Sequence, residues 1–116
     1  KYKPDNFTVL SGDDAITLPL ISIGVEGVIS VVANALPERF SHMVHSGVSG
    51  DFATANEEHY GLMKMTRLMF SEGNPGGVKE ALVYREICEN HMRLPLVPVS
   101  ESLKTEIIKE MKVLMG

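Results

Sequence analysis

The sequence is poor in several kinds of residue whose abundance marks a specialised class of protein. Its 116 residues include one cysteine and no tryptophan, and aromatic residues make up 6%. The single cysteine, Cys88, cannot form an intramolecular disulfide, which excludes a disulfide-stabilised scaffold and favours the reducing cytoplasm. No basic excess exists either, since 11 Lys and Arg stand against 15 Asp and Glu for a net charge of −4. Nucleic-acid binding is therefore not expected, because it needs cations to neutralise phosphates.

Long apolar runs are also missing. The longest, residues 18–25 and 28–36, are much shorter than the roughly 20 apolar residues that cross a bilayer, and no signal-peptide pattern opens the chain, so no membrane association is expected. What remains is a globular composition, with 44% hydrophobic and 22% charged residues. The chain does not open with Met and enters an apolar run already at Phe7. We therefore expect it to be a piece of a longer protein.

The first half of the chain predicts two units of a β-strand followed by an α-helix. Residues 7–10 and 27–32 are apolar and β-favouring. The second run does not alternate with polar residues, which is typical of a parallel strand covered on both faces. Helical patterns follow over 15–23, where Pro19 predicts a kink or a late start, and over 35–48. The fold class indicated is α/β with the rhythm of βα units.

The second half predicts three helices. Asp51 is expected to cap a long one, Asn74 and Pro75 to open a second one with Cys88 facing inward, and Ser100 to cap the last. Residues 94–98 read Leu-Pro-Leu-Val-Pro, and we expect them to be extended because each proline also restrains its predecessor.

The two predicted strands raise a difficulty of their own. A stable sheet generally needs about three or more strands, and unpaired parallel edges promote aggregation. We therefore expect the remaining strands to come from other chains or from an upstream segment.

No residue by itself makes a convincing catalytic centre. Gly12, Asp13 and Asp14 lie just past a predicted strand, where parallel α/β folds build their sites, but a turn and a helix cap explain them as well. His42 and His45 lie three residues apart on a predicted helix. The sequence supplies no further converging ligands beside them, so no metal site is expected.

Three other features also have structural explanations. The glycine-rich residues 72–79 open a helix as phosphate loops do, but Val78 stands where a P-loop has Gly and Glu80 where it has Ser or Thr. Cys88 is expected to be a buried structural thiol rather than a nucleophile. A lysine at the end of a predicted strand would favour a Schiff-base site. None of the seven lysines has that position.

Five short motifs occur in a specific order along nearly the whole chain. They are VLSGDD at 9–14, GVISV with AN at 27–34, GDF at 50–52, NP with VK at 74–79, and MRLPLVP at 92–98. Together they resemble the carboxy-terminal part of the dihydrodipicolinate synthase family, which belongs to the pyruvate-dependent class I aldolases. The resemblance implies the last two βα units of a (β/α)8 barrel, residues 1–48, followed by a three-helix C-terminal extension, residues 49–116.

The resemblance also implies a function. The family condenses pyruvate with aspartate-4-semialdehyde through a lysine Schiff base, for lysine and diaminopimelate biosynthesis, commonly as a cytoplasmic homotetramer without an added cofactor. Its catalytic lysine precedes the region matched here, so the chain alone is expected to be inactive without the upstream barrel. By the resemblance, the main-chain carbonyl of Ile29 faces bound pyruvate, Gly12 and Asp13 line the pocket, and Asp14 caps a helix.

Two alternatives stay open. A sibling pyruvate-dependent lyase, such as N-acetylneuraminate lyase, would share the barrel and the Schiff base. A non-catalytic helical interaction module would instead pair its apolar segments with a partner or with a second copy. One departure from the family is Gly76-Gly77, where relatives often place a second proline, and we expect it to loosen the start of that helix.

Overall fold

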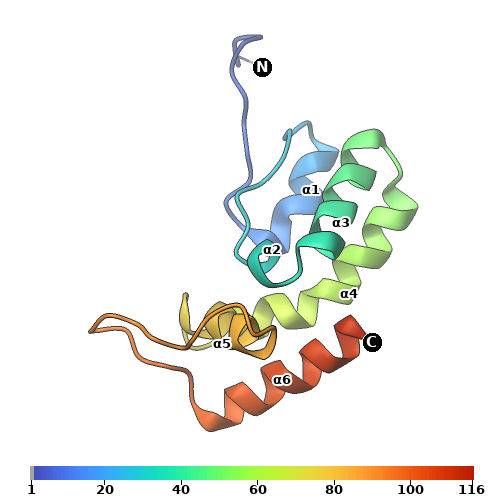
Figure 1. The fold of residues 1–116 in the computed structure, drawn as a ribbon. Helices are drawn as coiled ribbons and strands as arrows, with labels where there is room; N and C mark the ends of the chain where they lie inside the picture. The colour runs from blue at the N-terminus through green and yellow to red at the C-terminus, as the bar shows by residue number, and fades with distance from the viewer. Residues whose placement is uncertain (1) are drawn as a thin grey trace.

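The computed structural model describes residues 2–116, and helices dominate it (Figure 1). In chain order they are the 3-10 helix η1 (Asp14–Ile16), α1 (Thr17–Ser22), α2 (Val32–Ala35), α3 (Pro37–Ser49), α4 (Phe52–Phe70), α5 (Gly76–Tyr84) and α6 (Glu101–Met115). Helices α3 and α4 pack side by side, and α5 and α6 pack on each other and on α4. The amino-terminal segment extends away from the helices (Figure 1). The three helices predicted in the second half are present, although α5 begins at Gly76, with Pro75 rather than Asn74 at the capping position.

The helix starts follow the capping residues of the sequence. The Asp51 carboxylate accepts a hydrogen bond from Thr54 N at 3.1 Å, and the Ser100 hydroxyl accepts one from Leu103 N at 3.3 Å. Each satisfies a backbone N–H that would otherwise lack an intrahelical partner. Pro19 lies in the first turn of α1, where no intrahelical bond is lost, so the predicted late start is confirmed.

One hydrophobic cluster joins all six α-helices. Its buried members are Leu18, Val32, Ala35, Leu36, Phe40, Met43, Ala55, Leu62, Met65, Met69, Val78, Ala81, Val99, Leu103, Ile107 and Met111. Helix α4 contributes four of these side chains and lies at the centre of the packing. Burial of this apolar surface is what holds the short helices α1 and α2 in place, because helices of their length are unstable in isolation.

The prediction of two β-strands is wrong for the described residues. Residues 7–10 and 27–32 contain no strand. An isolated parallel bridge joins Ser11 to Val28, and beside it Glu26 N donates to the carbonyl of Val9 at 3.1 Å. The second run also turns into α2 at Val32. The parallel direction and the helical crossover between the segments agree with a βα unit. A full ladder needs further strands alongside, which these two segments cannot provide for themselves.

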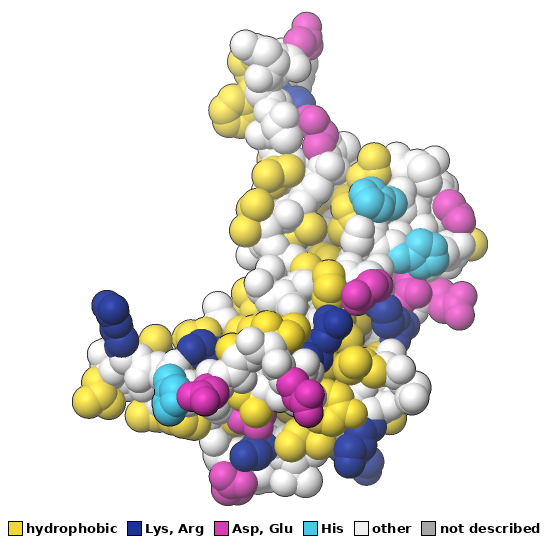
Figure 2. Space-filling model, viewed as in Figure 1, with side chains coloured by type: hydrophobic (Ala, Val, Ile, Leu, Met, Phe, Trp, Pro, Cys, Tyr) yellow, Lys and Arg dark blue, Asp and Glu magenta, His cyan; other side chains and the backbone are white. Residues whose placement is uncertain are grey.

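The same segments expose apolar side chains. Phe7 is 60% exposed, Leu10 47% and Ile29 73%, and Figure 2 shows hydrophobic side chains along the extended amino-terminal segment. A strand covered on both faces has this composition, but within residues 2–116 no second layer covers it. The apolar surface is thus suited to packing against further sheet.

The region after α5 differs from the prediction. Cys88 is exposed rather than buried, because α5 ends at Tyr84 and the chain leaves the core as an irregular loop. Leu94 and Pro95 form a turn, closed by a bond from Leu96 N to the carbonyl of Arg93 at 3.1 Å, instead of an extended stretch. Within the described residues, every helix is too short or too polar to cross a bilayer.

Candidate functional site

The parallel bridge brings the predicted site residues to one edge. Ser11 N donates to the carbonyl of Gly27 at 2.8 Å, and Ile29 N donates to the carbonyl of Ser11 at 2.9 Å. Gly12 and Asp13 therefore leave this pairing at the same end as Ile29. It is the carboxyl end of both segments, the end at which α/β barrels build their active sites.

Gly12 and Asp13 border a hollow of about 340 Å³ between η1 and α4. Its lining residues are Gly12, Asp13, Ala15, Thr66, Arg67 and Phe70. Asp13 also caps η1, because its Oδ1 accepts a hydrogen bond from Ala15 N at 2.8 Å. Asp13 and Arg67 thus bring opposite charges to one concave surface, whereas Ile29 is not among the residues that line it.

Ser11, which the sequence reasoning did not single out, organises this turn. It is 3% exposed, and its hydroxyl accepts a hydrogen bond from Asp13 N at 3.2 Å and donates to the carbonyl of Asp13 at 3.0 Å. The Thr17 hydroxyl lies 3.0 Å from that of Ser11 and donates to the carbonyl of Asp13 at 2.7 Å. These bonds fix the backbone next to Gly12. The sequence signal for this role was the position of Ser11 at the start of a turn, where serine hydroxyls often bond to nearby backbone.

Asp14 does not cap the helix that follows it, as the resemblance had implied. Its carboxylate, in a residue only 3% exposed, reaches the other parallel segment. There it accepts hydrogen bonds from Val31 N at 3.1 Å, from Val32 N at 3.3 Å and from the Ser30 hydroxyl. Asp13 caps η1, and Asp14 instead holds the amino end of α2. Local spacing could not reveal this, because the partners lie 16 to 18 residues away.

The histidine pair lies apart from this edge. His42 and His45 are exposed on α3, and His42 Nδ1 is 3.4 Å from Glu58 Oε1. Arg39 binds the other oxygen of the same carboxylate at 2.7 Å. Residues 2–116 contain no group of three or more side chains placed to hold a metal ion. Arg39 and Glu58 form an ion pair between α3 and α4, with His42 beside it and His45 near Ser41 instead.

The glycine-rich stretch joins α4 to α6. The Glu72 carboxylate accepts hydrogen bonds from Ser100 N at 2.7 Å and from the Ser100 hydroxyl at 2.6 Å. These two bonds hold the pKa of Glu72 below its ordinary value of 4.5. Gly77 lies against the backbone of Met69. Gly77 thus allows α5 to pack closely on α4, a role that the sequence did not predict.

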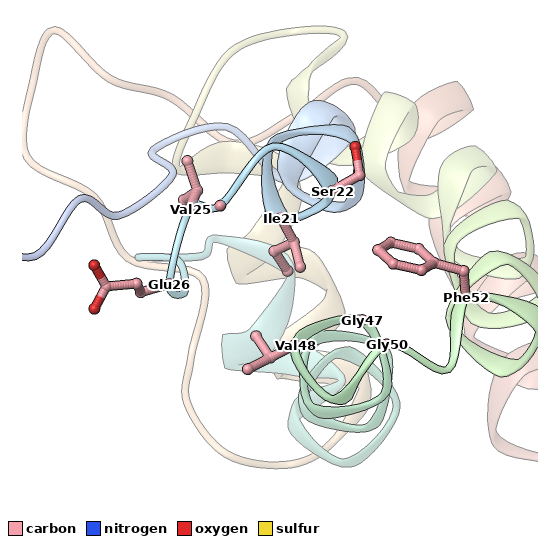
Figure 3. A pocket seen from close by; sticks show the side chains of 9 residues that line it. Ile21, Ser22, Val25, Glu26, Gly47, Val48, Gly50 and Phe52 are labelled. Carbon is pink, nitrogen blue, oxygen red and sulfur yellow. The ribbon is translucent and has the colours of Figure 1, made fainter. Parts of the chain in front are cut away.

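A larger hollow, of about 600 Å³, lies at the opposite end of the parallel pairing (Figure 3). Side chains from α1, α3 and the start of α4 surround it, among them Ile21, Val48 and Phe52. Glu26 borders it too, but its carboxylate points away and pairs with Lys3 at 2.6 Å. Because this hollow adjoins the amino end of the second segment, it is not where a barrel enzyme places its chemistry.

Comparisons with known proteins agree with the geometry. The sequence model of the dihydrodipicolinate synthetase family matches residues 1–114. The chain is 46% identical over 117 residues to the 4-hydroxy-tetrahydrodipicolinate synthase of Phocaeicola vulgatus, covering 97% of this chain and 39% of that protein. Its structure matches the dihydrodipicolinate synthase of Aquifex aeolicus with a TM-score of 0.92 and 37% identity, over 97% of this chain and 38% of that one.

A further solved relative is the chloride-inhibited dihydrodipicolinate synthase of Acinetobacter baumannii, determined in complex with pyruvate. It matches 91% of this chain and 36% of its own length, with a TM-score of 0.87 and 30% identity. These neighbours are (β/α)8-barrel enzymes, so the chain is part of a (β/α)8-barrel fold. It belongs to the dihydrodipicolinate synthetase family, as the ordered motifs predicted. The chain spans less than two-fifths of the length of these relatives.

Proposed function

We propose that the chain contributes one wall of the active site of a cytoplasmic lyase that condenses pyruvate with aspartate-4-semialdehyde in lysine and diaminopimelate biosynthesis. The observation that carries this proposal is the parallel bridge at Ser11, which brings Gly12, Asp13 and Ile29 to one edge. The chain that holds this edge matches the synthase family along nearly its full length. In this proposal residues 1–48 belong to the barrel and residues 49–116 to the C-terminal extension.

Ile29 has the main-chain role in the proposed site. Its N–H is occupied by the carbonyl of Ser11 at 2.9 Å, whereas neither hydrogen bond of the bridge uses its own carbonyl oxygen. That oxygen is therefore available to face pyruvate. Gly12 contributes only backbone to the pocket wall. Asp13 contributes a carboxylate, and the Ser11 hydroxyl holds the backbone of Asp13 in place.

The catalytic lysine of the proposed enzyme lies outside this chain. Several lysines here already have partners: Lys64 pairs with Glu110, Lys104 with Glu80, and Lys79 donates to the carbonyl of His91. None of these three borders the hollow at Gly12 and Asp13. The proposal therefore places the Schiff base on an upstream barrel segment, in a homotetramer, and expects residues 1–116 alone to be inactive.

Borohydride trapping tests the proposal. The full-length protein that carries this sequence would be incubated with pyruvate, reduced, and analysed by intact mass and peptide mapping. We expect one reduced pyruvyl adduct per chain, on a lysine outside residues 1–116, with no adduct when pyruvate is omitted. An adduct on Lys64, Lys79 or Lys104 would overturn the assignment of the nucleophile, and no adduct at all would overturn the proposed function in favour of the non-catalytic module.

The second substrate is tested separately. The relatives named above carry the synthase name, which favours aspartate-4-semialdehyde over the sialic acid substrate of the sibling lyases. The full-length protein should consume pyruvate only when aspartate-4-semialdehyde is added, and it should not cleave N-acetylneuraminate. Cleavage of N-acetylneuraminate would instead assign the protein to the sibling activity.

A further inference from the structure

Helix α2 is a single turn, Val32–Ala35, that begins three residues after Ile29. A helix this short does not persist by itself, because nucleation costs more than one or two hydrogen bonds return. Two charged side chains from distant parts of the chain hold it, one at each end.

Asp14 holds the amino end. The bonds from Val31 N and Val32 N, together with the bond from the Ser30 hydroxyl, direct three donors at one carboxylate. An ionised carboxylate only accepts hydrogen bonds, so it suits three converging donors, whereas an amide would turn its NH₂ group toward one of them. In the described part of the chain no cation lies within salt-bridge distance of Asp14. Burial of this charge is thus compensated by the hydrogen bonds to one short backbone segment.

Arg85 holds the carboxyl end. It follows the last residue of α5, and its Nη1 donates to the carbonyl of Ala35, the last residue of α2, at 2.7 Å. The side chain is 22% exposed, and Glu38 lies 3.9 Å from the same nitrogen. A cation at this end stabilises the free carbonyls of the helix terminus. The contact ties the C-terminal helices to the backbone beyond Ile29, across 50 residues of sequence.

The carbonyl of Ile29 lies between two sets of these constraints. It belongs to the peptide group that joins Ile29 to Ser30. On one side the N–H of Ile29 is bound to the carbonyl of Ser11, and on the other the Ser30 hydroxyl and Val31 N are bound to Asp14. A shift of the α2 turn must therefore rotate or displace this peptide group.

From these contacts we infer that Asp14 and Arg85 are positioning residues that hold the Ile29 carbonyl in place for bound pyruvate. The inference rests on the proposed function, since only there does this carbonyl meet a substrate. Neither side chain touches pyruvate. Asp14 acts within the barrel edge, and Arg85 couples that edge to the C-terminal helices.

The test measures the pyruvate concentration that half-saturates borohydride trapping in the full-length protein. Asp14→Asn should raise this concentration about tenfold, which corresponds to about 1.4 kcal/mol of pyruvate binding. The maximum extent of trapping should stay unchanged, because the lysine is not altered. Asp51→Asn is the matched control. It makes the same substitution at the exposed start of α4, where Asp51 binds Thr54 N, and it should leave half-saturation unchanged even if stability falls.

Arg85 provides the second variant, because its partly exposed side chain is more tolerant of replacement. Arg85→Ala should raise the half-saturating pyruvate concentration about threefold, about 0.6 kcal/mol by the same conversion. Arg85→Lys, which keeps a donor and a charge, should restore most of the affinity. Arg39→Ala is the control, since Arg39 binds Glu58 between α3 and α4.

The outcomes separate the two proposals. If the unaltered protein traps no pyruvate, the proposed function fails and this inference fails with it. If the unaltered protein traps pyruvate but Asp14→Asn and Arg85→Ala both keep its half-saturation, the positioning role alone is wrong. If Asp14→Asn does not fold, Arg85→Ala and Arg85→Lys decide the question.

Discussion

Gly77 at the start of α5 lies directly against Met69 of α4. A Cβ atom built at Gly77 would be 2.6 Å from the Met69 Cα, closer than real Cβ contacts come. Only a hydrogen atom fits there, which explains a glycine in a helix where alanine has the higher propensity. The junction between α4 and α5 therefore depends on the absence of a side chain.

Replacing Gly77 by alanine should destabilise the protein. Because the obstacle is backbone, Gly77→Ala should force α4 and α5 apart and lower the free energy of unfolding by about 1–3 kcal/mol. Gly12→Ala is the matched control, since nothing lies within 4 Å of its Cβ position, and it should change stability by less than about 0.5 kcal/mol. Urea denaturation compares them, and a stabilised Gly77→Ala would contradict the packing described here.

The Lys64–Glu110 pair should behave as a buried charge with an exposed partner. Glu110 is 6% exposed, and Lys64 Nζ lies 2.5 Å from its carboxylate. Lys64→Met leaves that carboxylate without its cation and should cost about 1–3 kcal/mol. The double variant Lys64→Met/Glu110→Met should regain most of the loss, because two apolar side chains replace the pair.

A thermal or urea unfolding series measures these variants. Lys112→Met is the control, because Lys112 is exposed on α6, the helix that carries Glu110. Its free energy of unfolding should lie within about 0.5 kcal/mol of that of the unaltered protein. A double variant that is less stable than Lys64→Met would show that the pair is not the source of the effect.

Glu72 should make part of the stability depend on acid pH. Its hydrogen bonds from the Ser100 hydroxyl and N–H lower its folded-state pKa below 4.5, so the unfolded chain takes up the proton first as the pH falls. The stabilisation from the ionised Glu72 is therefore complete above pH 4.5, its unfolded-state pKa, and is lost as the pH falls through the folded-state pKa. Glu72→Gln should be less stable than the unaltered protein at neutral pH, and the difference should shrink in acid.

Two measurements test the Glu72 prediction. Denaturant midpoints across the acid range follow the difference between the two proteins, and an NMR titration of Glu72 follows its pKa directly. In Ser100→Ala the pKa should return toward 4.5, because the hydroxyl contact is the largest of its causes. A difference in stability that stays constant with pH would be inconsistent with the Glu72–Ser100 contact.

Cys88 should react readily in the folded protein. It lies beyond the end of α5 and is exposed, so a thiol reagent should modify it at a rate close to that in denaturant. Peptide mapping after iodoacetamide treatment measures the rate at this residue. Cys88→Ser should change stability by less than about 0.5 kcal/mol. Protection by several orders of magnitude would restore the buried position expected from the sequence.

Capping residues and helix periodicity predicted the C-terminal half well. Asp51 and Ser100 cap α4 and α6 as predicted, and the apolar residues Leu103, Ile107 and Met111, spaced at helical intervals, are buried. These signals depend on neighbours within one turn, so they can be read locally. The inward position of Cys88 failed because it assumed that α5 continues past Tyr84, and nothing in the local pattern predicts that it ends there.

The sequence predicted which residues leave the parallel pairing together, but not which hydrogen bonds hold them there. The position of Gly12 and Asp13 after an apolar run predicted that they follow the carboxyl end of the parallel pairing, and the bridge at Ser11 places them there. That Asp13 rather than Asp14 caps η1 was not predictable. Either carboxylate can cap the next helix, and the choice depends on backbone donors at Val31 and Val32 that folding brings to Asp14.

The sequence by itself determined the family, the starts of α4 and α6 and the parallel direction of the two apolar segments, because motif order, capping and apolar periodicity are properties of short stretches. Only the tertiary structure decided that these segments form a single bridge, that Gly77 packs on Met69, and that Asp14 and Arg85 hold the two ends of α2. Each of these is a contact between residues far apart in the chain. Such contacts depend on how the helices pack around α4, which no local pattern encodes.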